Sequence, residues 1–279
     1  MIAAPDLLVV GGLSIDRFPD GSTAAGGSVL HAARAVAATG SRVATIVLAG
    51  GEPEAQVALT ELADLGPCLL HRTAATTRFA IDERRAVRRL VLEAAGGEMR
   101  IAVGEVDRWG AAAVLLAPIA GELDASVLRA ARHVPVRVAA LQGWLRTLQP
   151  GVEVAPLRPR ALSAELVAEL RHLSALVASV EDLIAVGPSP DQQLDALRDL
   201  FGAGPRLIVT KGPHGARLDL PGADRLDVSA PRPLSDVPTV GAGDAFAALL
   251  TVQLGKGVDP GAAAAEAAMR VTELLDRFR

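Results

Sequence analysis

The chain has 279 residues, of which half are apolar, a net charge of -4 and an aromatic content of only 3%. That much apolar sequence can bury a large core, whereas the lack of net positive charge and of rings for base stacking argues against a nucleic-acid-binding protein. The single cysteine, Cys68, excludes an internal disulfide framework and any multi-cysteine metal site, as is typical of the reducing cytoplasm. The first apolar run, residues 7–10, is too short for a signal sequence or a membrane span, so we expect a soluble, cytoplasmic protein.

The chain begins with a strand, a glycine-containing loop and a helix. Residues 7–10 predict a buried strand, Asp16 lies on the loop that follows it, and Gly26-Gly27 opens an alanine-rich helix that ends at Gly40. A second strand at 43–48 and a second helix at 52–65 repeat the pattern. This order of elements predicts a parallel sheet.

The pattern changes after the second helix. Residues 76–81 and 86–93 predict a hairpin around a charged turn at 82–85, and residues 98–103 predict another strand. Because no helix separates these strands, we expect an antiparallel sheet that projects from the core as a lid over about 72–103. The alternative is that the hairpin lies at the edge of the main sheet.

Strands and helices alternate again from residue 113. We expect strands at 113–117, 136–141, 175–179 and 206–210, a hairpin of 216–220 with 225–229, and helices at 122–132, 164–171, 191–200, 243–254 and from Asp259-Pro260 to about 277. No repeat or linker divides the chain. The predicted fold is a single α/β domain over 1–279, with a doubly wound, mostly parallel sheet flanked by helices and a small antiparallel β lid.

One stretch near the C-terminus carries chemistry of its own. Gly241-Ala242-Gly243-Asp244 precedes a run of helix-forming residues and describes a tight turn at a helix N-terminus. Glycines there let the backbone approach a phosphate, and the exposed N–H groups stabilise negative charge. Asp244 adds a carboxylate that can accept a proton from an attacking hydroxyl. Taken alone, the motif also fits a flexible turn capped by an aspartate.

Over almost its full length the sequence resembles the ribokinase-like, or PfkB, family of sugar and nucleoside kinases. Residues 239–246 match the family's C-terminal signature, and Gly26-Gly27 with the helix that ends in Thr39-Gly40 is similar to its N-terminal signature. The resemblance implies the ribokinase-like fold, ATP as phosphate donor with Mg²⁺, and a homodimer formed through the lid. It also implies three groups of site residues: catalytic Gly241, Ala242, Gly243 and Asp244; substrate-binding Asp16, Gly26, Gly27, His31, Gln142 and Arg146; and nucleotide-binding Thr210, Lys211, Gly212, Gly215 and Thr239.

The sequence also departs from the family pattern. His31 stands where members commonly have Asn, and Pro238 replaces the Asp that opens the C-terminal signature. Residues 142–146, Gln-Gly-Trp-Leu-Arg, replace Asp-x-Asn-x-Arg, and residues 179–182, Ser-Val-Glu-Asp, replace the Asn-x-x-Glu segment that orders magnesium-bound water. The chain contains no asparagine, so no shifted alignment restores these positions. These two segments resemble those of plant inositol kinases and their bacterial relatives more than those of ribokinase.

The sequence therefore predicts a magnesium-requiring kinase that transfers the γ-phosphate of ATP to a hydroxyl of a small polyol, a sugar or an inositol, with Asp244 as general base. A nucleoside kinase and a non-catalytic nucleotide- or sugar-binding protein on the same fold are the alternatives. Several residues also have purely structural interpretations: a turn cap for Asp16, helix packing for His31, a solvated side chain for Lys211, a structural ion pair for Arg146, and a helix N-terminal pair for Glu181 and Asp182, which are the candidates for a magnesium site.

Overall fold

A computed structural model describes residues 3–82, 89–102, 104–232 and 239–277 of the chain. Three of the predicted features reach beyond these ranges: the turn and the start of the second lid strand within 83–88, the end of a lid strand at residue 103, and the proline at position 238. No helix of the described residues is long and apolar enough to cross a membrane.

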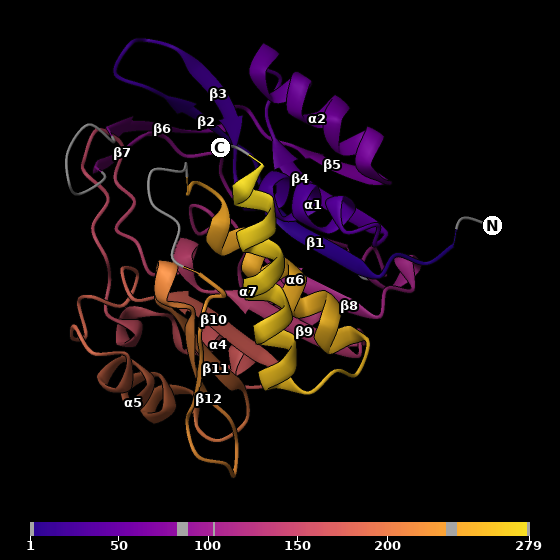
Figure 1. The fold of residues 1–279 in the computed structure, drawn as a ribbon. Coiled ribbons are helices and arrows are strands. Elements are labelled where there is room, and N and C mark those ends of the chain that lie inside the picture. Colours follow the sequence, from indigo (N-terminus) through magenta and orange to yellow (C-terminus); the bar gives the residue numbers. More distant parts are fainter. Residues whose placement is uncertain (1–2, 83–88, 103, 233–238, 278–279) are drawn as a thin grey trace.

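The main sheet of the described chain has nine strands in the order β13-β12-β11-β10-β9-β8-β1-β4-β5 (Figure 1). Every neighbouring pair from β11 to β5 is parallel, and the two antiparallel pairs are β11–β12 and β12–β13. The strands are β1 (Leu7–Gly12), β4 (Val43–Ala49), β5 (Cys68–Arg72), β8 (Ala113–Leu116), β9 (Val136–Ala140), β10 (Ala175–Ser179), β11 (Arg206–Thr210), β12 (Ala216–Asp219) and β13 (Leu226–Val228). The mostly parallel sheet predicted from the sequence is therefore confirmed. Strand β5 was not predicted from the sequence.

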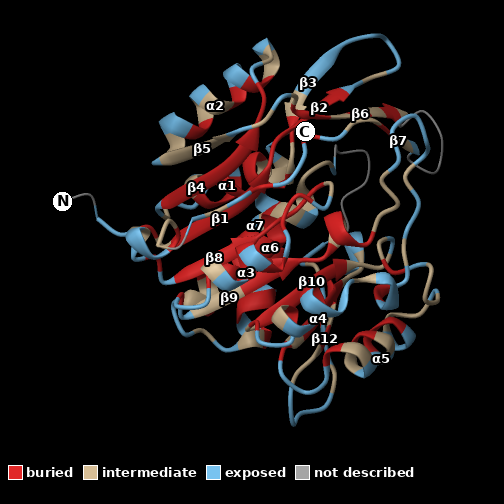
Figure 2. Ribbon diagram, turned by 180° about the vertical axis from the view of Figure 1, so that it is seen from behind, coloured by how far each residue is buried: buried red, intermediate tan, exposed pale blue. Residues whose placement is uncertain are grey.

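Helices cover both faces of this sheet because its strands are apolar on both sides. Leu7 and Val9 of β1 belong to one buried cluster, whereas Leu8 and Val10 belong to the other. Figure 2 shows the resulting buried central layer. The first cluster includes residues of α1 (Ser28–Ala38), α2 (Pro53–Leu65), α6 (Ala242–Gly255) and α7 (Pro260–Asp276), and the second includes residues of α3 (Ala125–Ala130), α4 (Ala164–Leu170) and α5 (Pro190–Phe201).

Local capping chemistry sets several helix starts. Asp259 accepts hydrogen bonds from the N–H groups of Gly261 and Ala262 at the start of α7, as its position before Pro260 predicts. The helix predicted over 122–132 is shorter than expected, because Asp124 caps it and α3 spans only Ala125–Ala130. Short 3₁₀ turns complete the secondary structure: η1 (Asp107–Trp109), η2 (Gln142–Trp144), η3 (Pro159–Ala161) and η4 (Gly212–His214).

A second sheet forms the lid, with four strands in the order β3-β2-β6-β7 among the described residues. They are β2 (Ser14–Arg17), β3 (Thr23–Gly26), β6 (Thr77–Asp82) and β7 (Arg89–Ala94). The β6–β7 hairpin is confirmed, and its place in a separate sheet rules out the main-sheet edge as an alternative. The inner side of the lid packs Phe79, Ile81 and Leu92 against Ile119 of the core.

Three expectations about the lid region are wrong. Asp16 lies in strand β2 and not on a loop, and Arg72 ends β5 of the main sheet. The small antiparallel sheet itself is confirmed by the β2–β3 and β6–β7 pairs, with β2 and β6 running parallel where the two pairs meet. Residues 98–102 form no strand, because Met99 is buried and its N–H donates to the Glu122 carbonyl, which fixes this segment to the core. Strands β2 and β3 are four residues each and mostly polar or small, so their sequences lack a strand-like apolar pattern.

A segment from the main body pairs with the outer edge of the lid. The N–H groups of Gly151 and Val154 donate to the carbonyls of Leu92 and Leu90 at 2.7 Å each, and Glu153 forms an ion pair with Arg89. This segment lies a few residues after the 3₁₀ turn η2 in the chain. The free edge of β7 is thereby covered, as edge strands in natural proteins usually are.

Candidate active site

The order of the main sheet reverses between β1 and β8. From β1 the chain moves outward through β4 to β5, whereas from β8 it moves in the opposite direction through β9 and β10 to β11. Ligands of open α/β sheets bind at such a switch point, beyond the carboxyl ends of the strands. The segments that follow β1, β9, β10 and β11 carry most of the predicted site residues.

Glu122 occupies the crevice at this switch point. Its side chain is 2% exposed, and its carboxylate accepts hydrogen bonds from the N–H groups of Gly12 (2.8 Å), Ile119 (3.0 Å) and Ala120 (2.8 Å). Burial raises the pKa of Glu122, although these backbone donors act to lower it. The carboxylate therefore joins the end of β1 to the segment after β8, at the point where the chain enters the lid.

We expect Glu122→Ala to lower the free energy of unfolding by about 3 kcal/mol or more, because three buried N–H groups lose their acceptor. Urea unfolding followed by circular dichroism measures the change. Glu98→Ala removes the same side chain from a site where it is 68% exposed, and it should change the free energy of unfolding by less than about 0.5 kcal/mol. If both variants lost the same free energy of unfolding, the hydrogen bonds that Glu122 accepts would not stabilise the fold.

The turn after β3 needs both of its glycines. A Cβ atom on Gly26 would lie 2.6 Å from the Asp16 carboxylate, and one on Gly27 would lie 2.7 Å from the Gly12 carbonyl oxygen. Gly27 also has a φ of 104°, which disfavours other residues. Asp16 is 8% exposed and pairs across the sheet with Phe79. The Gly-Gly turn thus lets the chain pass between β1 and Asp16 into α1.

The turn before α6 contacts the first turns of α1. Gly241 has a left-handed conformation with a φ of 79°, and a Cβ atom on it would lie 2.4 Å from the His31 ring. The Ala242 N–H donates to the Thr239 carbonyl at 3.0 Å, so this N–H group of the predicted phosphate-binding turn already has an acceptor. The first N–H groups of an α-helix have no carbonyl partner within the helix. In α6 these include the N–H groups of Gly243 and Asp244. Gly243 is exposed, with nothing within 4 Å of its Cβ position.

Asp244 lies in the first turn of α6 and faces charged and polar groups from three other segments. Its carboxylate interacts electrostatically with His31, Arg146 and Asp182. Burial raises the pKa of Asp244, and His31, Ser28 and Arg146 counteract part of that rise. A carboxylate with a raised pKa is a stronger base than an ordinary aspartate.

Arg146 and Asp182 come from neighbouring strand ends. The Arg146 guanidinium lies 4.0 Å from the Asp182 carboxylate. With the Gln142 amide assigned so that its oxygen faces Arg146, that oxygen accepts from the Nη1 atom of Arg146 at 3.0 Å. Asp182 also accepts from the N–H and the hydroxyl of Ser179, at 3.0 and 2.8 Å. Glu181, the other candidate metal ligand, is exposed.

The predicted nucleotide-binding segment follows β11. The Lys211 ammonium forms an ion pair with Asp227 at 2.6 Å. A Cβ atom on Gly215 would lie 2.0 Å from the Val228 carbonyl oxygen, so this glycine is needed for the hairpin of β12 with β13. Gly212 has a φ of 54° with nothing within 4 Å of its Cβ position, and Thr210 is half-buried at the strand end.

The structure thus connects residues that are far apart in the sequence. Asp16 lies beside Gly26 at the turn that precedes α1, and Arg146 interacts electrostatically with Asp244 and lies 4.0 Å from Asp182. Thr239 is exposed, next to the segment 233–238 that lies outside the described residues and contains Pro238. Glu122 was missed as a site residue, because a glutamate before a helix carries no signal of its own in one sequence.

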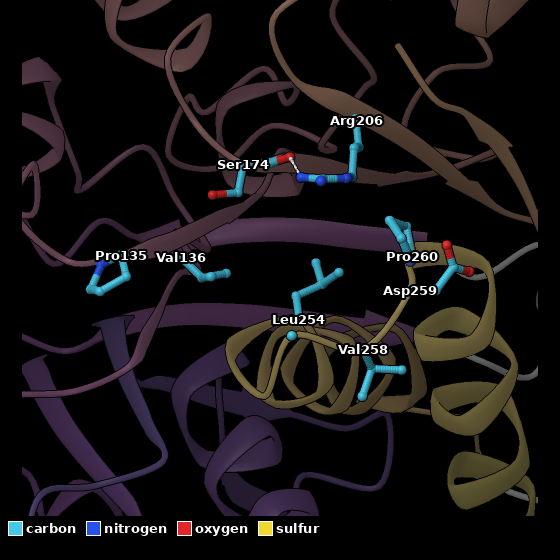
Figure 3. A pocket seen from close by; sticks show the side chains of 9 residues that line it. Pro135, Val136, Ser174, Arg206, Leu254, Val258, Asp259 and Pro260 are labelled. Carbon is cyan, nitrogen blue, oxygen red and sulfur yellow. Dashed lines mark hydrogen bonds between the residues drawn. The ribbon is translucent and has the colours of Figure 1, made fainter. Parts of the chain in front are cut away.

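A cavity of about 370 Å³ lies away from the candidate active site, at the amino ends of the strands (Figure 3). It is bordered by Val136 and Arg206 at the starts of β9 and β11, by Ser174 just before β10, and by Leu254 and Asp259 around the connection from α6 to α7. In Figure 3 the Arg206 guanidinium bonds to the Ser174 carbonyl at 3.2 Å. None of the predicted site residues borders this cavity.

Known proteins of the same fold were found by comparison of structures. No family model and no curated protein sequence matches the chain. A pyrophosphate-dependent kinase in the ribokinase family, complexed with a pyrophosphate analog and myo-inositol, is 19% identical with a TM-score of 0.76, covering 97% of this chain and 95% of its own. Ribokinase of Arabidopsis thaliana, complexed with ribose and ATP, is 17% identical with a TM-score of 0.75, covering 98% and 93%.

A fructokinase from Vibrio cholerae, a double mutant with fructose, ADP and potassium ion bound, is 18% identical with a TM-score of 0.71, covering 96% of this chain and 91% of its own. These three structures superpose on nearly the whole length of the chain. The predicted fold is confirmed: this chain has the ribokinase-like fold, which in these three structures carries kinases.

Proposed function

We propose that this protein is a kinase that transfers the γ-phosphate of ATP to a hydroxyl of a small polyol, a sugar or an inositol. The position of Asp244 carries the proposal. This carboxylate lies in the first turn of α6, just after the left-handed Gly241, and it interacts electrostatically with Arg146. One helix end thus combines N–H donors for a phosphoryl group with a base for the attacking hydroxyl. The likeness to ribokinase-family kinases supports this reading.

Each part of the site has a task in the proposed reaction. Asp16, in strand β2 of the lid sheet, would accept hydrogen bonds from substrate hydroxyls. The lid would exclude water and so limit hydrolysis of the donor. Asp244 would take the proton of the attacking hydroxyl, while the N–H groups of Gly243 and Asp244 and the Arg146 guanidinium stabilise charge on the transferred phosphoryl group.

Magnesium fits the carboxylates at this edge. Proteins usually hold Mg²⁺ through one or two carboxylates together with phosphate oxygens and water. Asp182 and Glu181 are the carboxylates after β10, and among the described residues no three His, Cys, Asp or Glu side chains form a metal cluster. Asp182 would hold the ion with the help of the donor's phosphates, and the ion would neutralise charge on those phosphates.

The donor and the acceptor can be identified in one experiment. The protein is incubated with Mg²⁺, with either ATP or pyrophosphate, and with myo-inositol, ribose, fructose or adenosine, and phosphate transfer is followed by phosphorus NMR. We expect transfer from ATP to a polyol and none with Asp244→Asn. Inorganic pyrophosphate is a second candidate donor, because one similar structure is a pyrophosphate-dependent kinase.

The alternatives give different results in the same experiment. Transfer to adenosine alone would indicate a nucleoside kinase. Binding of a donor and a polyol in a thermal-shift assay, without transfer to any acceptor, would indicate a non-catalytic binding protein and would refute the proposed activity.

A homodimer through the lid is also proposed, on the family resemblance. The outer edge of β7 already pairs with residues 151–154, so the partner would contact the outer face of the lid, where Arg17 pairs with Glu93. Analytical ultracentrifugation measures the oligomeric state. A monomer at micromolar concentration would contradict a stable dimer.

A further inference from the structure

Residues 145–157, which we call the strap, connect the candidate site to the lid. The strap begins directly after η2 in the main body, where Leu145 is fully buried in the second core cluster. Leu148 packs against the apolar cluster on the inner side of the lid. The chain therefore passes from the core of the main body to that of the lid within four residues, and Arg146 lies in this passage.

Hydrogen bonds fix the backbone of Arg146 to the returning half of the strap. Arg146 faces Pro156 in an isolated antiparallel bridge. On one side of this bridge the Thr147 N–H donates to the Ala155 carbonyl at 2.8 Å. On the other side the Leu157 N–H donates to the carbonyl of the residue before Arg146, also at 2.8 Å. The two halves of the strap are thus joined on both sides of Arg146.

The returning half of the strap is also joined to the lid strand β7. The Val154 N–H donates to the Leu90 carbonyl at 2.7 Å, and Glu153 faces Val91 in a second antiparallel bridge. The Val154 side chain packs against the lid cluster. A single residue separates Val154 from Pro156, so the bonds to the lid and the bonds to Arg146 belong to one short extended segment. Such a segment, bonded at both ends, carries a displacement from one end to the other.

The two ends of this connection carry the proposed acceptor and phosphate ligands. Asp16 lies in β2, which pairs with β6, and β6 pairs with β7. At the other end the Arg146 guanidinium lies 4.0 Å from the Asp182 carboxylate and interacts electrostatically with Asp244. A continuous series of paired strands therefore runs from Asp16 through the lid sheet and the strap to Arg146.

We propose that the strap is a positioning element, which sets the place of the Arg146 guanidinium according to the position of the lid sheet. A polyol that binds Asp16 and fixes the lid sheet thereby fixes the group that stabilises the transferred phosphoryl group. The inference rests on the proposed functions of Asp16 and Arg146. The strap acts only through Arg146, and a misplacement of that guanidinium by about 1 Å is enough to slow the reaction about 100-fold.

Val154→Pro tests the proposal through the division between kcat and KM, because it removes the N–H that bonds to Leu90. We expect kcat to fall by about 10- to 100-fold while KM for the polyol changes by less than about threefold, since Asp16 keeps its place in the lid sheet. Val154→Ala keeps the backbone and loses only the apolar contact with the lid, so it should show a smaller loss of kcat.

Val152→Ala is the matched control. It removes the same side chain two residues earlier in the strap, where that side chain is 48% exposed, and it keeps the backbone hydrogen bonds to β7. Both kinetic constants should stay unchanged in this variant. A Val154→Pro enzyme with the kcat of the wild type would overturn the proposal.

A reversible cross-link distinguishes positioning from a loss of stability. Val91 and Glu153 face each other across the two strands, at a spacing that a disulfide can span. With Val91→Cys and Glu153→Cys added to Val154→Pro, the oxidised protein should recover most of the lost kcat, and dithiothreitol should remove the recovery. Both forms are assayed at a temperature at which thermal unfolding shows them to be folded. Equal kcat in the oxidised and reduced forms would refute the positioning role.

One measurement separates failure of this inference from failure of the proposed function. The Nε–H resonance of Arg146, identified by its loss in Arg146→Lys, reports the surroundings of the guanidinium by nitrogen NMR without any turnover. Val154→Pro should shift this resonance and Val152→Ala should not. An unshifted resonance in Val154→Pro would refute the inference even if a polyol is phosphorylated. A shifted resonance, together with a wild type that phosphorylates no acceptor, would refute the kinase alone.

Discussion

Asp244→Asn should lower kcat by about 100-fold or more, while donor affinity changes little. The amide keeps the size of the carboxylate, but it cannot accept the proton of an attacking hydroxyl. Steady-state kinetics gives kcat, and calorimetric titration with a non-hydrolysable donor gives the affinity. A variant with near wild-type turnover would show that another group is the base.

The same carboxylate sets an expected pH dependence. Burial raises the pKa of Asp244 above that of an ordinary aspartate, and the base must be ionised to act. Activity should therefore fall as the pH is lowered through this raised pKa, at a higher pH than for an unperturbed aspartate. A profile of kcat/KM that stays flat down to pH 4 would contradict this assignment.

Gly241→Ala should abolish most of the activity and also destabilise the protein. The left-handed conformation of residue 241 costs a non-glycine residue about 1 kcal/mol, and the new Cβ would collide with the His31 ring at 2.4 Å. Relief of that collision displaces either the turn that presents the α6 N–H groups or the first turns of α1. We expect a loss in kcat of about 100-fold from such a displacement.

Gly257→Ala is the matched control for this substitution. Gly257 has nearly the same conformation, with a φ of 77°, but nothing lies within 4 Å of its Cβ position. It should lose about 1 kcal/mol of stability in urea unfolding and keep its activity. If both variants stayed equally active, close packing of Gly241 against His31 would not be needed for the phosphate site.

Residue patterns predicted the main body of this protein because each of its elements carries a local signal. The strands β1, β4 and β11 are short, apolar and β-branched, and Pro190 and Asp259 mark helix starts. The helix start after Gly241 is equally local, since a positive φ requires glycine. The sequence therefore determined the mostly parallel sheet, the lid hairpin and the candidate base.

The tertiary structure decided what surrounds that base. Strand β2 is recognisable only through its pairing with β3 and β6, which moves Asp16 from the predicted loop into the lid sheet. Glu122 has a role only because the ends of β1 and β8 meet at the switch point, and Gly241 meets the His31 ring only because α1 packs against α6. The contacts of Glu122 with Gly12 and of Gly241 with His31 join residues over 100 positions apart. A local pattern in the sequence cannot encode them, because they depend on how completed elements pack.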